Sequence, residues 1–498
     1  MTDKQRRTLG YLYNWTSLAG IIMAALGFVG GIVMLAMDYL NPNATVYSGI
    51  ITYLVVPVVI VAGLALTVAG NLRERRRQHQ AGAIPHRMPI IDLNNRQHYV
   101  SFVFAITVVF LFIILTGIGS FSAYKYTESV TFCGTTCHTP MQPENTAVAH
   151  SPHSHVRCVD CHIGPGAEWF VKAKLSGMHQ VYAVTVNNFH RPIQTPIHNL
   201  RPASETCYEC HWPAKFFGML EQTRTYYAAD KTNTPYTISY LLNVGGGDTT
   251  HGPARGIHYH MAVEKKIEYI AKDEKRQTIP WIRVTEKDGS VNVYKTTDKK
   301  EALAETNITA TATRRMDCMD CHNRPAHQFQ SPNRALDLSM MQGKIDPSIE
   351  FIKKNAAKAL LGKYTTQEQG IAEIGAQLHK SYPQGGANVE AAINEVQDIY
   401  SRNFFPEMKA DWRAYPDDIG HWISAGCFRC HDGKHKNEKG EVISRECKTC
   451  HVITSQGPGT KPTTYVRDGL DFKHPVEDDD GSWKEDSCNG CHSGAPDQ

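Results

Sequence analysis

Seven short segments of this 498-residue chain combine two cysteines with a histidine, and together they contain all 14 cysteines. In c-type haem attachment, two thiols bond covalently to the porphyrin, and the histidine that follows ligates the iron. One segment, Cys133-Gly-Thr-Thr-Cys137-His138, has an extra residue. The other six read Cys-x-x-Cys-His: Cys158–Cys161–His162, Cys207–Cys210–His211, Cys318–Cys321–His322, Cys427–Cys430–His431, Cys447–Cys450–His451 and Cys488–Cys491–His492. The sequence therefore predicts seven haem c groups, each with its motif histidine as the proximal iron ligand.

Two other uses of paired cysteines fit this pattern less well. A zinc site would need two Cys-x-x-Cys pairs for each metal, with no fixed histidine after each pair. A disulfide scaffold gives no reason for a histidine after every second cysteine. Since no cysteine is left over, haem attachment is the favoured interpretation. Covalent haem attachment takes place on the outer face of the cytoplasmic membrane, where these segments are therefore expected.

A low-spin haem that carries electrons needs a second axial ligand, and histidines are in excess here. Of the 24 histidines, fourteen lie after residue 124 and outside the motifs, which predicts mostly bis-histidine ligation. Met141, three residues after His138, is an alternative ligand that would raise the potential of the first haem. His379, on a predicted helix, is expected to be a surface or packing residue. The distal candidates are His327, His421, His435 and His474, each near a motif, together with His150, His198 and one of His258 and His260.

Three apolar runs before residue 125 are long enough to cross a bilayer. The stretches 8–37, 39–72 and 99–124 contain no Asp, Glu, Lys or Arg. A spanning helix needs about 20 mostly apolar residues. Buried helices of a soluble enzyme are disfavoured, because such helices carry polar faces. We therefore predict transmembrane helices at about 12–37, 47–70 and 100–123.

The distribution of basic residues predicts how these helices are oriented. The N-terminus carries Lys4, Arg6 and Arg7, and the link 73–98 is rich in arginine, whereas the link 38–48 has no Lys or Arg. Basic loops stay on the cytoplasmic side. The N-terminus is therefore expected in the bacterial cytoplasm, and everything after residue 124 in the periplasm or its equivalent.

The region after the last apolar run must hold seven haems in about 370 residues, so the haems themselves are expected to form much of its core. Mixed β-branched and aromatic residues predict strands at 236–244 and 263–270, with a break at Gly245-Gly246-Gly247 between them. Two further strands, at 282–284 and 291–294, flank a hairpin turn signal at Asp288-Gly289. Helices are predicted from an N-cap at Asp346-Pro347, from a capping box at Thr366–Gln369 and over Asn388–Phe404. The predicted organisation is a membrane anchor (1–124), a module with haems 1–3 (125–233), a β-rich insert (234–310), a haem 4 segment (311–345), a helical spacer (346–410) and a C-terminal segment with haems 5–7 (411–498).

These features together predict a membrane-anchored multihaem cytochrome c. Three N-terminal transmembrane helices would precede a haem-packed, mostly α-helical or irregular extracytoplasmic region with a small β-rich insert. The net charge of +3, with 20% charged residues, argues against a strongly basic nucleic-acid binder and against a disordered protein. No nucleic-acid partner is expected.

The region of the first four motifs resembles a known family. A membrane helix, the first motif with Met141, His150 before Cys158-Val-Asp-Cys161-His162, and Lys172-Ala-Lys174 are similar to the NapC/NirT family of bacterial quinol dehydrogenases. The resemblance covers roughly residues 100–330. The remainder of the chain resembles the longer ImcH-like inner-membrane cytochromes of metal-respiring bacteria, and the segment from Arg191-Pro192 to Pro213 strengthens that resemblance.

This resemblance implies that menaquinol is oxidised beside the first haem and that electrons pass to periplasmic c-type cytochromes or a terminal reductase. It also implies that Lys172 or Lys174 lies near the quinol site and that His150 is a distal ligand. Quinol releases protons as well as electrons, so a basic group is needed beside the first haem. Residues suited to that role in the same stretch are Lys172, Lys174, His179 and Glu144.

Two other functions remain open. The chain could be a passive electron-wire subunit of a larger respiratory complex, with the quinol site on a partner. A terminal multihaem reductase is the less favoured alternative, because it needs an open coordination position, and distal candidates are plentiful.

Overall fold

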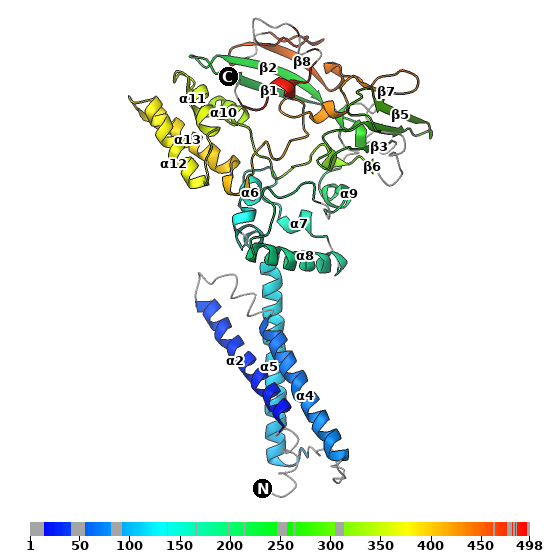
Figure 1. Cartoon of the computed structure of the whole chain (residues 1–498), viewed down its shortest axis with the longest axis vertical. Coiled ribbons are helices and arrows are strands. Elements are labelled where there is room, and N and C mark those ends of the chain that lie inside the picture. Colours follow the sequence, from blue (N-terminus) through cyan, green and yellow to red (C-terminus); the bar gives the residue numbers. More distant parts are fainter. Residues whose placement is uncertain are drawn as a thin grey trace. The chain divides into compact units, whose positions relative to one another are not determined.

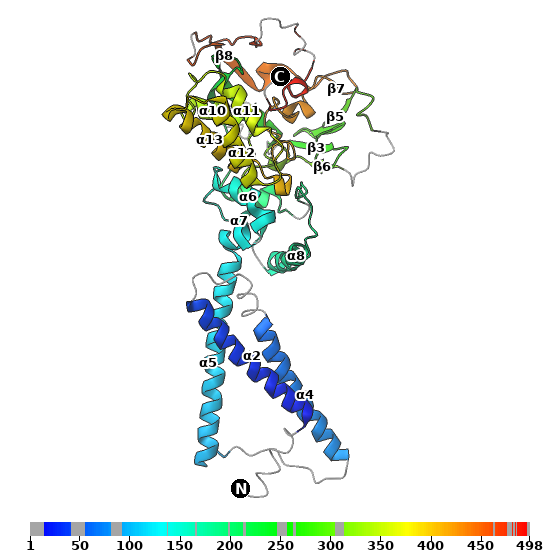
Figure 2. The same ribbon diagram turned by 60° about the vertical axis from the view of Figure 1, so that its left-hand side comes forward.

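The computed structural model divides the chain into two compact units, 1–136 and 137–498, which we describe separately (Figures 1 and 2). It describes residues 14–40, 55–80, 92–136, 138–164, 167–197, 200–212, 216–246, 256–261, 265–303, 313–461, 464–475, 481, 484 and 486–495.

The described part of the first unit contains three long helices, α2 (Trp15–Leu40), α4 (Val56–Gln80) and α5 (Arg96–Thr127). Two of them, over Trp15–Ile32 and Val56–Glu74, are apolar and long enough to cross a membrane. Most of their large apolar side chains are exposed, as lipid-facing side chains would be. The predicted third span, 100–123, falls within α5 and stays a prediction, as does the orientation.

Small residues let α2 and α4 approach closely. A Cβ atom on Gly63 would lie 2.6 Å from the backbone nitrogen of Ala24, and one on Gly20 would lie 2.6 Å from the Gly63 carbonyl oxygen. The Ser17 hydroxyl donates a hydrogen bond to the Thr67 carbonyl at 3.2 Å. Close contact of small residues together with polar bonds between helices is typical of helix pairs in lipid.

The second unit contains two antiparallel sheets. One has the strand order β1–β2–β8. The other has the order β6–β3–β4–β5–β7. The strand bounds are β1 Met219–Tyr227, β2 Pro235–Asn243, β3 Lys266–Ile270, β4 Trp281–Thr285, β5 Val291–Thr296, β6 Arg314–Arg315, β7 His435–Lys436 and β8 His451–Pro458.

The four predicted strands are confirmed as β2 to β5, and β4 pairs with β5 across the predicted turn. The β structure is not confined to a local insert, however. β1 begins before it, at Met219, and β7 and β8 come from the C-terminal segment to complete the two sheets. Pairing partners so far apart in sequence leave no local signal.

A haem-motif-free helical region supplies most of the apolar core. It comprises α10 (Pro332–Met341), α11 (Ile352–Leu360), α12 (Gln367–Ser381) and α13 (Ala387–Asn403), with Leu336, Ile352, Ile374, Leu378 and Val396 fully buried among them. The buried Asp337 carboxylate accepts a hydrogen bond from the backbone N–H of Tyr227 in β1 at 3.0 Å, which ties α10 to the first sheet.

The predicted helix starts were partly right. Thr366 caps α12 by accepting a hydrogen bond from the Gln369 backbone N–H at 3.1 Å, and α13 begins one residue before Asn388. The predicted N-cap at Asp346 was wrong. The segment 346–350 forms turns, and α11 starts at Ile352 after Phe351, which has a left-handed backbone conformation.

Candidate functional site

Each described Cys-x-x-Cys-His motif forms a short helical turn, which explains its spacing. The turns are α7 (Cys158–His162), η3 (Cys207–Glu209), η9 (Cys318–Asp320), η11 (Gly426–Arg429), η12 (Cys447–Thr449) and α14 (Cys488–Cys491). In four of them the backbone N–H of the histidine donates to the carbonyl of the first cysteine, for instance His211 to Cys207 at 2.7 Å. Residues three and four positions apart in such a turn share a face, so both sulfurs and the imidazole can serve one porphyrin.

The first motif differs in structure as it does in sequence. Residues Phe132–Thr136 form a π-helical turn, η2, whose wider spacing accommodates the extra residue. Cys137 and the side chain of His138 lie outside the described residues. The first motif therefore remains a sequence prediction.

The other six motif histidines each face a second histidine ring, and we call these the six histidine pairs. In every pair the ring centroids are 5.8–6.4 Å apart. The pairs, motif histidine first, are His162–His327, His211–His153, His322–His258, His431–His260, His451–His421 and His492–His474.

This spacing fits one iron between each two rings. Metal–imidazole bonds of about 2 Å on either side, with about 1 Å from each nitrogen to its ring centre, put the centroids about 6 Å apart. Direct hydrogen bonding or face-to-face stacking would bring the rings closer. Together with two cysteines in the same turn, each pair has the donor set for a covalently attached haem.

Backbone carbonyls hold the distal rings in place. The Nδ1 atoms of His153, His258, His260 and His327 lie 2.6–3.2 Å from the carbonyl oxygens of Pro325, Val244, Ile257 and Glu144. A carbonyl can only accept, so each Nδ1 carries the proton. The unprotonated Nε2 is thereby available as a metal ligand, the arrangement that second-shell carbonyls provide at many metal sites.

Proximity in sequence does not decide which motif a distal histidine faces. His327 follows the fourth motif but faces His162 of the second, and His421 precedes the fifth but faces His451 of the sixth. His474 faces the motif next to it. The sequence predicted that one of His258 and His260 is a distal ligand. Both are paired, with different motifs.

One paired residue was not among the predicted ligands. His153, in the turn before the second motif, faces His211 of the third. Its sequence signal, a histidine five residues before a motif, is no stronger than that of its neighbours His150 and His155. Exposed His150 donates its Nδ1–H to the Thr146 carbonyl at 2.8 Å. His198 lies outside the described residues, and Met141 is half-buried in α6 (His138–Ala149).

His435 is occupied by other partners. Its ring is fully buried, with Nδ1 2.9 Å from the Asp432 carboxylate and Nε2 2.7 Å from the Ile279 carbonyl. Burial opposes protonation, but the bond to Asp432 prevails and raises the pKa of His435. Neither nitrogen is available to iron in this arrangement, so His435 is a structural residue between β7 and the loop before β4.

Successive motifs lie next to one another. Burial and the neighbouring Cys207 sulfur both raise the pKa of Cys161, and a hydrogen bond from Cys318 lowers the pKa of Cys207 to about 7. The same kind of proximity links Cys321 to Cys427, Cys450 to Cys427, and Cys488 to Cys447. From the second motif to the seventh, each motif therefore has the next one in the sequence as a neighbour in space.

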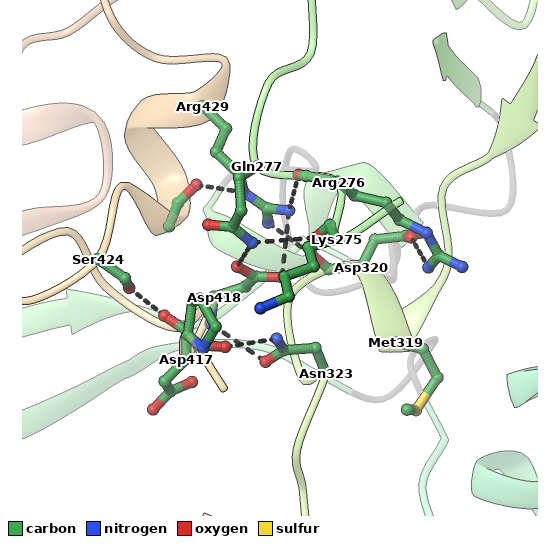
Figure 3. Close-up of polar contacts among 12 residues, drawn as sticks. Lys275, Arg276, Gln277, Met319, Asp320, Asn323, Asp417, Asp418, Ser424 and Arg429 are labelled. Carbon is green, nitrogen blue, oxygen red and sulfur yellow. Dashed lines mark hydrogen bonds and ion pairs between the residues drawn. The ribbon is translucent and has the colours of Figure 1, made fainter. Parts of the chain in front are cut away.

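A buried polar network joins the fourth and fifth motifs (Figure 3). The Arg429 guanidinium, between the two cysteines of the fifth motif, donates to the backbone carbonyl of Asp320 in the fourth at 2.6 Å and pairs with Asp418 at 3.2 Å. The Asp320 carboxylate, 3% exposed, is bound by Arg276 and Arg314. Burial raises the pKa of Asp418 to about 6, and the neighbouring Arg429 opposes this shift.

The residues predicted for the quinol site lie on two helices. Lys172, Lys174 and His179 are on α8 (Ala167–Thr185), where the Lys172 ammonium lies 5.1 Å from the centre of the Trp169 ring. Glu144 is on α6. Its largely buried carboxylate pairs with Arg324 at 3.0 Å and lies 3.1 Å from Nδ1 of His327. The arrangement makes Glu144 a neighbour of a histidine pair.

Attachment turns facing paired imidazoles define a cytochrome of the c type, a protein that transfers electrons through covalently bound haem. The chain belongs to the family of the cytochrome c-type protein ImcH: it is 41% identical over 501 residues to the protein of that name from Geobacter sulfurreducens, covering 98% of this chain and 97% of that relative. No protein-family model matches the chain. No solved structure matches it either.

Proposed function

We propose that this protein is a heptahaem quinol dehydrogenase of the bacterial cytoplasmic membrane. It takes electrons from menaquinol and passes them to periplasmic c-type cytochromes or a reductase in anaerobic respiration. The observation that carries this proposal is the set of six histidine pairs in a chain that also has membrane-length apolar helices.

The pairs support electron transfer rather than substrate reduction. Histidine on both sides of an iron leaves no coordination position for nitrite or another oxyanion. A terminal reductase would need such a position, and the six pairs offer none. We therefore assign His153, His258, His260, His327, His421 and His474 as distal ligands, and leave His150, His198 and Met141 as candidates for the first haem.

The sequential arrangement of the motifs supports electron transfer from one haem to the next along the chain. Haem supplies one-electron chemistry, whereas quinol gives up two electrons and two protons. The chain must therefore supply a proton acceptor where quinol binds. Lys172, Lys174 and His179 on α8 are the proposed groups. Glu144 is less suited, because Arg324 and His327 already bind its carboxylate.

Stopped-flow reduction by a menaquinol analogue tests the function. The purified, detergent-solubilised holoprotein and a Lys172→Ala variant would be compared, with Lys380→Ala on α12 as the matched control. We expect rapid haem reduction in the wild type and the control, and a rate at least about a hundredfold lower in the variant, because a positioned proton-transfer group contributes about 10²–10⁴-fold.

The other outcomes separate the alternatives. Equal rates in both variants would keep the function but move the site away from Lys172. If the quinol analogue fails to reduce haems that dithionite does reduce, the chain is a wire that needs a quinol-oxidising partner. A high-spin haem whose spectrum shifts on adding cyanide or nitrite would favour a reductase.

A further inference from the structure

Helix α8 carries an exposed apolar stripe. Leu175, Met178 and Tyr182 are spaced by three and four residues, so they share one face, and their side chains are 58%, 57% and 64% exposed. Val186, just after the helix, extends the stripe. Contiguous exposed apolar surface of this kind marks a contact with a partner or a membrane.

The protein itself leaves this helix largely uncovered. None of the α8 residues whose burial the structure describes is buried. In both views α8 lies at one end of the second unit, away from its sheets (Figures 1 and 2). On the opposite side of the helix Ala173, Gly177 and Val184 are half-buried, whereas the three residues of the stripe are exposed.

Positive charge borders the stripe on both sides. At 100° per residue, Lys174 lies along one edge, and Lys172 and His179 lie along the other. No Asp or Glu occurs from Trp169 to Ser204. Basic residues flanking an apolar face, with Trp and Tyr present, are typical of helices that lie in the interface of a membrane with anionic lipids.

We propose that α8 lies in the plane of the membrane interface, with its apolar stripe against acyl chains and its lysines at phospholipid phosphates. The same chain has two helices suited to span a bilayer, which supply the membrane that the proposal needs. The proposal requires membrane attachment but not quinol oxidation.

Photo-crosslinking from lipid tests this contact directly. The holoprotein would be placed in nanodiscs containing anionic phospholipids, some with a photoreactive group in the acyl chain, and then digested and mapped by mass spectrometry. We expect adducts on α8 at Leu175, Met178 or Tyr182 as well as on α2 and α4, and none on α12. Adducts on α2 and α4 without any on α8 would overturn the proposal. The apolar stripe would then be expected to contact a haem, a second copy of the chain or a protein partner.

Charge reversal tests the role of the lysines. In Lys172→Glu and Lys174→Glu variants, the α8 adduct yield should fall about fivefold per residue in anionic nanodiscs, the factor expected for one basic residue at such a surface. Labelling of α2 and α4 should not change, and Lys380→Glu is the matched control on α12. Unchanged α8 labelling in both variants would contradict the proposed headgroup contacts. Lipid crosslinking does not depend on electron transfer. A negative result here would therefore reject the membrane contact of α8 without rejecting quinol oxidation, and a negative quinol assay would leave the membrane contact standing.

Discussion

At the scale of residues, the six histidine pairs differ mainly in the angle between their rings. The planes of His258 and His322 are 1° apart, whereas those of His260 and His431 are 88° apart. Parallel axial imidazoles lift the degeneracy of two iron d orbitals, and perpendicular imidazoles leave it nearly intact. The two irons would therefore have different magnetic anisotropy despite identical ligand types.

Electron paramagnetic resonance of the oxidised protein should reveal this difference. We expect a strongly anisotropic low-spin signal from the site of His260 and His431, and an ordinary rhombic low-spin signal from that of His258 and His322. A His260→Ala variant should lose the strongly anisotropic signal, and His258→Ala should keep it. Persistence of that signal without His260 would refute the assigned pair.

His435 should matter for stability and not for haem ligation. We expect His435→Asn to leave all haems low-spin, but to lower the free energy of unfolding by about 1.5–3 kcal/mol, the usual value of a hydrogen bond to a charged group. The pKa of His435 is raised in the folded protein, so its charge stabilises the fold fully below the unfolded pKa of about 6.5, and this contribution is lost as pH rises through the folded pKa.

The pH dependence provides the measurement. Chemical unfolding followed by circular dichroism should show a larger loss in the variant at pH 6 than at pH 9. A new high-spin haem in His435→Asn would instead make His435 a ligand, contrary to the geometry.

At the scale of elements, one short turn carries two of the histidines that we propose as distal ligands. The 3-10 helix η6 (Ile257–Met261) carries His258 and His260 only two residues apart, yet they face the fourth and fifth motifs. Rings two positions apart in a tight turn point in different directions. If both histidines bind iron, this turn helps to fix the distance between the two irons. The Arg429 network, which joins the fourth and fifth motifs, does the same from the side of the cysteines.

Substitutions in η6 should act on separate haems. His258→Ala and His260→Ala should each convert one haem to a high-spin form, and the double variant should convert two, as counted from the high-spin absorbance of the oxidised protein. His379→Ala is the matched control, since exposed His379 on α12 pairs with Glu390. A single variant that converts two haems, or none, would contradict the assignment of one iron to each histidine.

At the scale of the whole molecule, the attachment sites of the second unit form a sequential series. Sulfur neighbours link each motif from the second onward to the next. A second contact joins the sixth and seventh motifs. The ring of Trp422, the residue after His421, lies 5.8 Å from the ring of His492. In such a linear series each motif has at most two neighbouring motifs, so electrons have one path to the last one.

Removing an inner site should therefore interrupt electron flow. Cys447→Ser together with Cys450→Ser abolishes the sixth attachment site. We expect quinol to reduce the sites before it at the wild-type rate, and the last site many-fold more slowly, in stopped-flow traces resolved by wavelength. Removal of the terminal site, by Cys488→Ser with Cys491→Ser, is the control and should slow none of the others. Undiminished reduction of the last site would show that the arrangement branches.

The sequence alone determined the features that depend on local spacing. Cysteines three residues apart with a histidine next to them share one turn, and the apolar runs of α2 and α4 are long enough for a bilayer by composition alone. The strands β2 to β5 and the helices α12 and α13 were likewise predictable, because each has its own periodicity or cap.

Only the tertiary structure decided which histidine faces which motif. His327 and His162 come together because the segment after the fourth motif folds back on α6, where Arg324 pairs with Glu144. β8 likewise joins β2 from more than two hundred residues away. An imidazole reaches an iron through space, and its sequence position constrains that approach only weakly. For this reason the sequence did not single out His153, which faces His211, and it favoured His435, whose two ring nitrogens contact Asp432 and Ile279.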